Sequence, residues 1–334
     1  MIERFNFYDV YGYLIPGAFW LALMWLPFGL RSGFPSWTAT EITVVGLLGS
    51  YIAGHLLYGM ARFFFSSKVE DEQGRERLLS SVVLDQDNHV LSASVKTRLA
   101  EQVNRRFGID VSDLAQRGDA FFLCRSALAQ AKASSYVEQY QGMNSLTRGL
   151  ATGAIFAVAF YLGWMAATCF SSSGVVWTDR FSACAGAVIA LAPLVVIVSL
   201  DFAAKRLLAG IKRKPEERAQ GKMEASASAE RPSPRTSHRH WGVIGNLLKR
   251  AEGITFALVL AAIGYFVGQS YPLSGSQALR LAVIGAILLI TSRRLAIAAK
   301  SFNESLAVAV YRDFIVLAAA QQAEPVRTGD RREA

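Results

Sequence analysis

The sequence predicts an all-α fold: a polytopic membrane helix bundle of about six spans with a small helical cytoplasmic domain. The first observation is a series of apolar stretches at residues 14–30, 42–65, 149–170, 181–200, 254–273 and 277–292. Most of them come near the roughly 20 residues that a membrane-crossing helix needs. The second observation is that the three short connections within successive pairs of stretches, with the stretch ends that border them, hold only three of the 35 basic residues: Arg31, Arg180 and Arg280. Because cytoplasmic loops retain Lys and Arg, both termini are predicted to lie in the cytoplasm, at a bacterial inner membrane.

The same pattern divides the chain into six regions. They are an N-terminal interfacial arm with spans 1–2 (1–65), a cytoplasmic helical domain (66–148), spans 3–4 (149–200), a basic, partly disordered cytoplasmic linker (201–250), spans 5–6 (251–292), and a cytoplasmic amphipathic helix with a frayed tail (293–334). The soluble mass that this division leaves is one modest domain. It leaves no room for a large enzymatic domain.

Charge is distributed unevenly between the two cytoplasmic regions. The chain has a net charge of +9, but segment 66–148 holds 11 basic and 11 acidic residues and is neutral. The excess lies beside the membrane, where residues 205–250 hold 12 basic and four acidic residues. Juxtamembrane basic residues gain about 1 kcal/mol each from anionic lipid. We therefore expect anionic headgroups as the partner of this linker and no nucleic acid, and leave homo-oligomerisation open.

Residues 2–13 are rich in aromatic side chains, which prefer the headgroup layer, so this arm is expected to lie at the interface and turn inward near Pro16 and Gly17. In the cytoplasmic domain, apolar residues recur every four positions from Leu91 to Phe107, which predicts an amphipathic helix over 92–107 that ends at Gly108. A long helix is predicted over 119–148, running on into the third span as a rigid lever.

The second span carries the strongest candidate functional group. His55 lies within it, with Tyr51 and Tyr58 about one turn away on either side. Ionisable groups inside a membrane are costly and indicate function by default, although a neutral imidazole that only hydrogen-bonds Tyr51, Tyr58 or Asp9 fits the sequence as well. The same span has a ridge of small residues that predicts close helix packing: Gly46, Gly49, Ser50 and Gly54.

The C-terminal region contains the shortest apolar stretch. About 16 residues at 277–292 are marginal for a span, although basic residues at both ends can snorkel. A tail helix follows over about 293–320. One of its faces is an apolar stripe that is predicted to dock on the helices of 92–148: Phe302, Leu306, Val310 and Phe314.

No motif for catalysis, cofactor binding or metal binding is present. The three cysteines, Cys124, Cys169 and Cys184, have no CxxC spacing and are expected to be small buried apolar residues rather than disulfides or metal ligands. His238 and His240 lack further ligands for a closed metal site, and His89 is expected at the surface. Phosphate-binding loops and nucleophile motifs are missing. We therefore expect no enzyme and no cofactor.

Three short blocks resemble segments of bacterial multi-spanning inner-membrane proteins. They are Cys124-Arg125-Ser126, the block from Ser135 to Tyr140, and the block from Val310 to Phe314. The resemblance covers about a fifth of the chain, points to no single named family and implies no activity.

Together these features predict a non-enzymatic integral membrane protein that couples a cytoplasmic helical domain to a membrane bundle. Such a protein would act as a sensor or as a pore-forming or membrane-perturbing effector. The alternative is a small-solute transporter or channel with His55 on the pathway.

Overall fold

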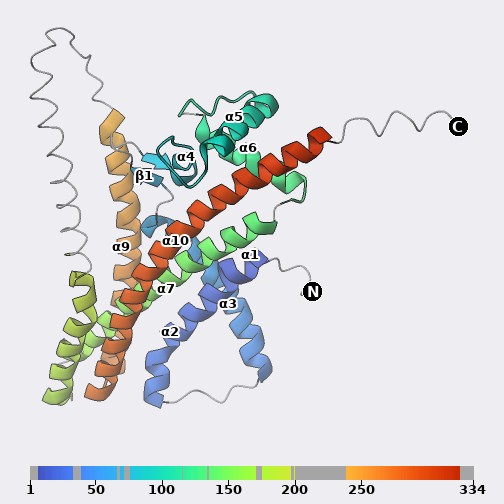
Figure 1. The fold of residues 1–334 in the computed structure, drawn as a ribbon. Coiled ribbons are helices and arrows are strands. Elements are labelled where there is room, and N and C mark those ends of the chain that lie inside the picture. The colour runs from blue at the N-terminus through green and yellow to red at the C-terminus, as the bar shows by residue number, and fades with distance from the viewer. Residues whose placement is uncertain are drawn as a thin grey trace, which may run out of the picture. The chain divides into compact units, whose positions relative to one another are not determined.

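The computed structural model describes residues 7–32, 39–65, 68–70, 76–114, 116–133, 135–170, 175–196, 199 and 238–323. The described chain is almost entirely helical (Figure 1), which confirms the all-α fold class. Six of its helices are long and apolar enough to cross a membrane: Val10–Leu30, Thr43–Phe64, Tyr136–Phe170, Trp177–Val196, Glu252–Ser270 and Gly275–Gln322. These six segments indicate a multi-span integral membrane protein.

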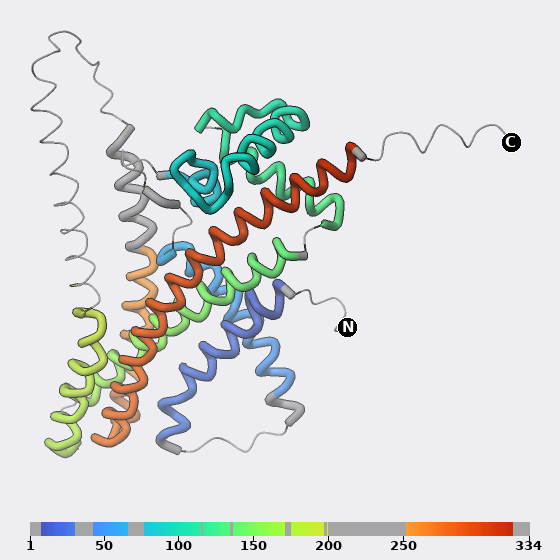
Figure 2. Tube along the Cα trace, viewed as in Figure 1, coloured from blue at the N-terminus to red at the C-terminus, as the bar shows by residue number. Residues whose placement is uncertain are grey.

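The chain divides into two compact units. The first consists of Met1–Ala22, Ser36–Gly153 and Arg293–Ala334, and the second of Leu23–Pro35 and Ala154–Ser292. Three helices contribute residues to both units: α2 (Ile15–Ser32), α7 (Ser135–Phe170) and α10 (Gly275–Ala323), which can be followed by colour in Figure 2.

The N-terminal arm is helical from Phe7 and does not turn at Pro16. Helix α1 (Phe7–Asp9) leads into a π-helix, η2 (Val10–Leu14), and then directly into α2. The expected inward turn is therefore wrong. Pro16 lies directly after the π-helix, inside this continuous helical run, and does not end it.

Helix α3 (Ala39–Phe64) is followed by a short antiparallel pair of strands, β1 (Lys68–Glu70) and β2 (Glu76–Leu78), in which Val69 pairs with Arg77. Strands of three residues are too short to show the alternation that identifies a strand in a sequence. Helix α4 (Leu79–Val82) comes next and is followed by a turn at Asp85, in which the Asn88 N–H donates to the Asp85 carbonyl at 3.1 Å.

Helix α5 (Ala93–Phe107) confirms the amphipathic helix predicted over 92–107. Leu99 and Val103 are buried on one face. Gly108 ends it in the left-handed conformation, φ 68°, and its N–H bonds the Asn104 carbonyl at 2.8 Å. Glycine reaches this conformation without the clash that a side chain brings.

The helix predicted over 119–148 is broken in the middle. Helix α6 (Arg117–Gln130) ends before α7, and Lys132 between them takes a left-handed conformation with φ 54°. The N–H of Ala133 bonds the Leu128 carbonyl at 3.0 Å, and the N–H of Lys132 bonds Ala129 at 3.1 Å. This is a Schellman motif, which normally uses glycine. The expected continuity into the third span holds only from Ser135 onward.

Helices α9 (His238–Ser270) and α10 are longer than the predicted spans. The stretch from Trp241 to Arg250 is part of α9, and the sixth apolar stretch and the tail helix form one helix, α10. Its 49 residues correspond to roughly 74 Å at 1.5 Å per residue, well beyond the roughly 30 Å of a hydrocarbon core. The linker predicted to be disordered over 211–238 lies outside the described residues, except His238.

Candidate functional site

His55 lies on α3 with its ring stacked on that of Tyr13. The two ring centroids are 3.8 Å apart and the planes differ by 13°. The His55 Nδ1 lies 3.0 Å from the Tyr51 carbonyl oxygen, which only accepts, so the proton of the neutral ring is assigned to Nδ1. This leaves Nε2 as an acceptor on a ring that is exposed at the surface of the unit.

The rings of Tyr13 and Tyr51 contact His55, and those of Tyr8 and Tyr58 contact Tyr13. We call the five residues the tyrosine–histidine cluster: Tyr8, Tyr13, Tyr51, His55 and Tyr58. The Tyr13 hydroxyl donates to that of Tyr8 at 3.4 Å. The rings of Tyr13 and Tyr58 meet edge to face, with centroids 5.4 Å apart. Tyr51 and Tyr58 were predicted beside His55, whereas Tyr8 and Tyr13 were missed because they come from the arm.

Helix α7 supplies further polar groups to the Tyr8 hydroxyl. Ser145 donates to it at 3.5 Å, and Gln141 is a second hydrogen-bond partner. Arg148 donates to the Phe65 carbonyl at 2.7 Å and so satisfies the end of α3, where a cation is favoured by the helix dipole. Its guanidinium also interacts electrostatically with Tyr8 and Tyr58.

Close contact between backbones places Tyr13 against His55. A Cβ on Gly54 would lie 1.9 Å from the Tyr13 carbonyl oxygen, and one on Gly17 would lie 1.7 Å from the Ser50 carbonyl oxygen. Only glycine fits at such distances. The π-helix η2 shapes the segment that carries Tyr13, and π-turns occur frequently at functional sites.

The small-residue ridge of α3 is not uniform. Ser50 and Gly54 are buried, at the closest approach to the N-terminal segment. A Cβ on Gly49 would lie in ordinary contact with Leu21 at 3.4 Å, and one on Gly46 would meet nothing within 4 Å.

A second set of glycines joins α7 to α9, and the sequence analysis missed it. A Cβ on Gly163 would lie 1.8 Å from the Ala261 carbonyl oxygen, and one on Gly264 would lie 2.2 Å from that of Phe160. The sequence does indicate this contact, since Gly264 and Gly268 have the GxxxG spacing that is typical of close helix pairs in membranes.

The predicted docking stripe of the tail lies largely in the hydrophobic core of the first unit. Leu306, Val310 and Phe314 are buried there with residues of α5 and α6, and the Phe314 ring stacks on Phe107 with centroids 5.6 Å apart. Phe302 is half-buried and outside this core. The prediction missed Tyr311, which is fully buried and donates to the Ser80 carbonyl at 3.1 Å.

Asp85 connects three segments of the same unit. Its carboxylate accepts from Arg77 at 2.8 Å and from Arg117 at 2.5 Å, and Lys96 donates to its carbonyl oxygen. Burial opposes ionisation of this carboxyl, but the hydrogen bonds and charges of the two arginines outweigh it and lower its pKa. The ion pairs therefore persist at neutral pH.

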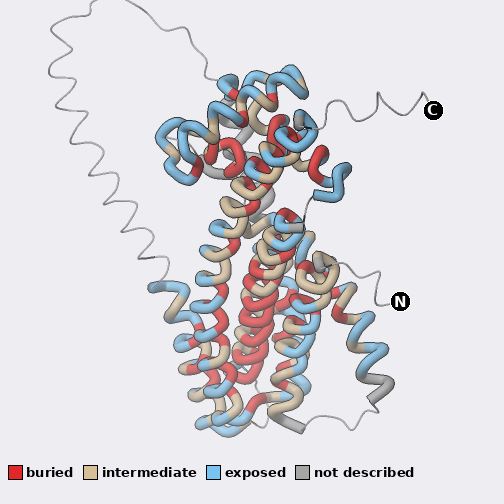
Figure 3. Tube along the Cα trace, turned by 45° about the vertical axis from the view of Figure 1, so that its right-hand side comes forward, coloured by how far each residue is buried: buried red, intermediate tan, exposed pale blue. Residues whose placement is uncertain are grey.

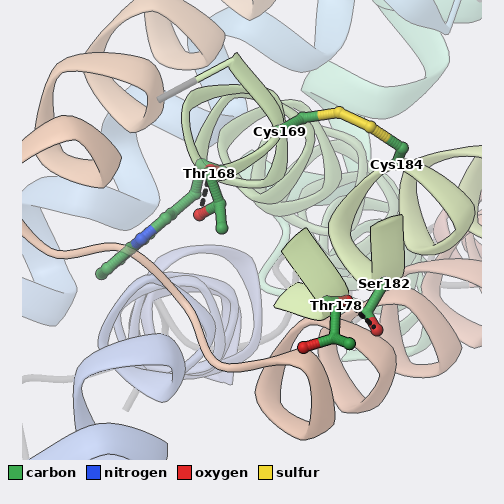
Figure 4. Close-up of a disulfide and its surroundings, with 6 residues drawn as sticks. Thr168, Cys169, Thr178, Ser182 and Cys184 are labelled. Carbon is green, nitrogen blue, oxygen red and sulfur yellow. Dashed lines mark hydrogen bonds between the residues drawn. A yellow bond between two sulfur atoms is a disulfide. The ribbon is translucent and has the colours of Figure 1, made fainter. Parts of the chain in front are cut away.

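The interpretation of the cysteines is wrong for two of the three. Cys169 and Cys184 form a disulfide, with Cα atoms 5.6 Å apart (Figure 4), and Cys184 is exposed. Only the packing of two helices brings these cysteines together, so their spacing in the sequence does not indicate a disulfide. Cys124 is a buried free thiol, and burial raises its pKa to about 12, which keeps it protonated and unreactive.

Within the described part of the chain, no group of three or more His, Cys, Asp and Glu residues could hold a metal ion. The side chains of His238 and His240 lie outside the description, and His89 is exposed. Buried positions follow α7 along most of its length and α10 in the first unit (Figure 3). Comparison with protein-family models, curated proteins and solved structures finds no match for this chain.

Proposed function

We propose that this protein is a non-enzymatic membrane protein that couples a cytoplasmic helical domain to its membrane bundle, as a sensor or as a pore-forming or membrane-perturbing effector. The observation that carries the proposal is that α7 and α10 have no break between the two units. Helix α10 places Leu306 and Phe314 in the core of the first unit and Leu281 among the buried residues of the second.

Shared helices are a physical means of coupling. A helix keeps its hydrogen-bonded geometry from end to end, so a change in packing at one end biases the other end through an element with few alternative arrangements. Helix α7 works in the same way, with Val137 in the core of the first unit and Trp164 buried in the second.

The distribution of charge supports an orientation for this assembly. We place the first unit's helical core and both termini in the cytoplasm of a bacterial inner membrane, because the three short connections and the helix ends beside them hold only Arg31, Arg180 and Arg280. Anionic lipid is the expected partner of the basic residues at 205–250, self-association of the chain is compatible with the proposal, and nucleic acid binding is not part of it.

Coupling can be tested with Leu99→Ala in the full chain in nanodiscs. Leu99 is fully buried in α5, which belongs to the first unit alone, and its truncation should cost about 2–5 kcal/mol. Hydrogen exchange followed by mass spectrometry should become faster in α5, and the increase should extend along α7 and α10. Leu114→Ala is the matched control, since Leu114 is exposed. An increase confined to residues 79–130 would contradict coupling.

A transporter or channel with His55 on its pathway is the second candidate. The tyrosine–histidine cluster supports it, because an exposed imidazole in a span, in contact with hydroxyl-bearing rings, suits a polar route better than lipid.

Cysteine accessibility distinguishes this candidate from a purely structural role of the tyrosine–histidine cluster. His55→Cys and Tyr58→Cys should react with a membrane-impermeant thiol reagent if water reaches the cluster. Leu48→Cys is the control, because Leu48 is an exposed apolar residue of the same helix. Gly54 cannot be used as a probe position, because any side chain there meets the Tyr13 backbone. If neither H55C nor Y58C reacts, the pathway is refuted.

A further inference from the structure

We infer that the end of the second unit carrying the Cys169–Cys184 disulfide lies outside the reducing cytosol, and that this bond is a redox-dependent staple holding the helix Trp177–Val196 to α7. The inference rests on the membrane orientation proposed above but not on coupling between the units, because the bond and its surroundings lie within the second unit. Cys169 is the penultimate residue of α7, and Cys184 lies in the first half of the helix that follows.

The disulfide lies at the same end as the short connections. At this end of the unit, Trp164 donates to the Tyr271 carbonyl at 2.7 Å, and the Leu273 N–H donates to the Thr168 hydroxyl at 3.2 Å. The side-chain amide of Gln277 donates a hydrogen bond to the Leu30 carbonyl at 3.2 Å. The ends of α2, α7, α9 and α10 therefore meet here, and the connections between these helices are the ones poor in Lys and Arg.

Two independent properties assign the disulfide end of the second unit to the side of the membrane away from the cytosol. Connections that lack basic residues are those that are translocated. Disulfides form and persist in oxidising compartments and are rare where cytosolic thiols keep cysteines reduced.

Formation of this bond needs an oxidant, which we identify as a thiol-oxidising protein of that compartment. The thiolate of one cysteine attacks the disulfide of this protein, and the second thiolate then displaces it as a dithiol. Two protons and two electrons leave the pair overall. Cys184 is exposed and Cys169 half-buried, and the bond joins two neighbouring helices (Figure 4).

Among its described residues, the helix Trp177–Val196 packs on the rest of the second unit through small side chains, and the bond adds a covalent link to this packing. The buried positions of this helix are small residues, Ala183, Gly186 and Ala190, whereas Phe181 and Val188 are exposed. Asp179 adds one hydrogen bond, accepting from the Gly275 N–H at 2.7 Å at the start of α10. The disulfide supplies the covalent attachment that this packing lacks.

Counting thiols in the wild-type chain tests whether the bond forms. Full-length protein in membranes, denatured and alkylated without reductant, should bind one maleimide–polyethylene glycol, at Cys124, and three after reduction. Three additions before reduction would overturn the proposal. In nanodiscs, reduction should speed hydrogen exchange over 177–185 while α5 stays unchanged, and equal rates would remove the staple role.

Two introduced cysteines test the compartment, each in a Cys124→Ala background that keeps the native disulfide. Val176→Cys lies in the connection, and Ser126→Cys is an exposed position of α6. An impermeant maleimide should label V176C in intact cells and S126C only after lysis. The reverse pattern would place the disulfide in the cytosol and refute the inference.

Discussion

Replacing Phe314 with Asp should unfold the hydrophobic core of the first unit and expose the tail of α10 to protease. Phe314 is fully buried and stacks on Phe107. Loss of a buried Phe costs about 3–5 kcal/mol through the missing contacts alone. A carboxylate buried in this core adds a desolvation penalty of several kcal/mol, of which the Arg106 guanidinium, 5.9 Å from the Phe314 ring centroid, offsets a part. The sum approaches the 5–15 kcal/mol that stabilises a typical domain.

Limited proteolysis of the full chain in nanodiscs measures this effect, with cleavage in 300–323 as the readout. Leu306→Asp should behave like Phe314→Asp, because both residues belong to the same core. Val316→Asp is the matched control: it lies two residues further along the same helix but is 68% exposed, against 0% for Phe314. If the two Asp variants and V316D are cleaved alike, the tail does not dock on this core.

Gly54→Ala should disrupt the contact between α3 and the N-terminal segment although it adds one methyl group. The new Cβ would lie 1.9 Å from the Tyr13 carbonyl oxygen, a distance that real Cβ atoms do not show. The obstacle is backbone and cannot change rotamer, so the helices must move apart. Overpacking costs typically 1–3 kcal/mol, and we expect about 3 kcal/mol or more here.

Gly46→Ala is the control for this substitution, because Gly46 belongs to the same ridge but a Cβ there meets nothing within 4 Å. Thermal unfolding in detergent should give a lower Tm for G54A and an unchanged one for G46A. The separation of His55 from Tyr13 should follow as a second consequence, measurable as loss of a cross-link between His55→Cys and Tyr13→Cys. Equal Tm values for the two alanine variants would refute the close approach.

The elements that could be predicted from the sequence are those with a local periodic signal. The six apolar segments and helix α5 depend on spacing within 15–20 residues, so they were visible without a structure. The docking stripe from Leu306 to Phe314 was visible for the same reason. The break at Lys132 was not, because its Schellman motif contains no glycine to indicate it.

Features that depend on which helices pack together could not be predicted. The Cys169–Cys184 disulfide and the burial of Tyr311 against α4 arise from packing between separate helices. His55 was identified because an ionisable side chain inside a membrane costs free energy. Its stacking partner Tyr13 could not be identified, because it lies 42 positions away in the arm and is brought to His55 by the close contact of Gly54 with the Tyr13 backbone.

The π-helix at Val10–Leu14 changes which residues of the arm share a face. Its hydrogen bond runs from the Ile15 N–H to the Val10 carbonyl, so residues five apart lie near the same face, and the rings of Tyr8 and Tyr13 meet edge to face with centroids 5.3 Å apart. In an α-helix the same pair would diverge by about 140°. Deleting one residue from this turn would preserve the aromatic content of the arm and still rotate its tyrosines out of alignment. Here the residue count within a single turn, rather than side-chain identity, determines which hydroxyl meets which.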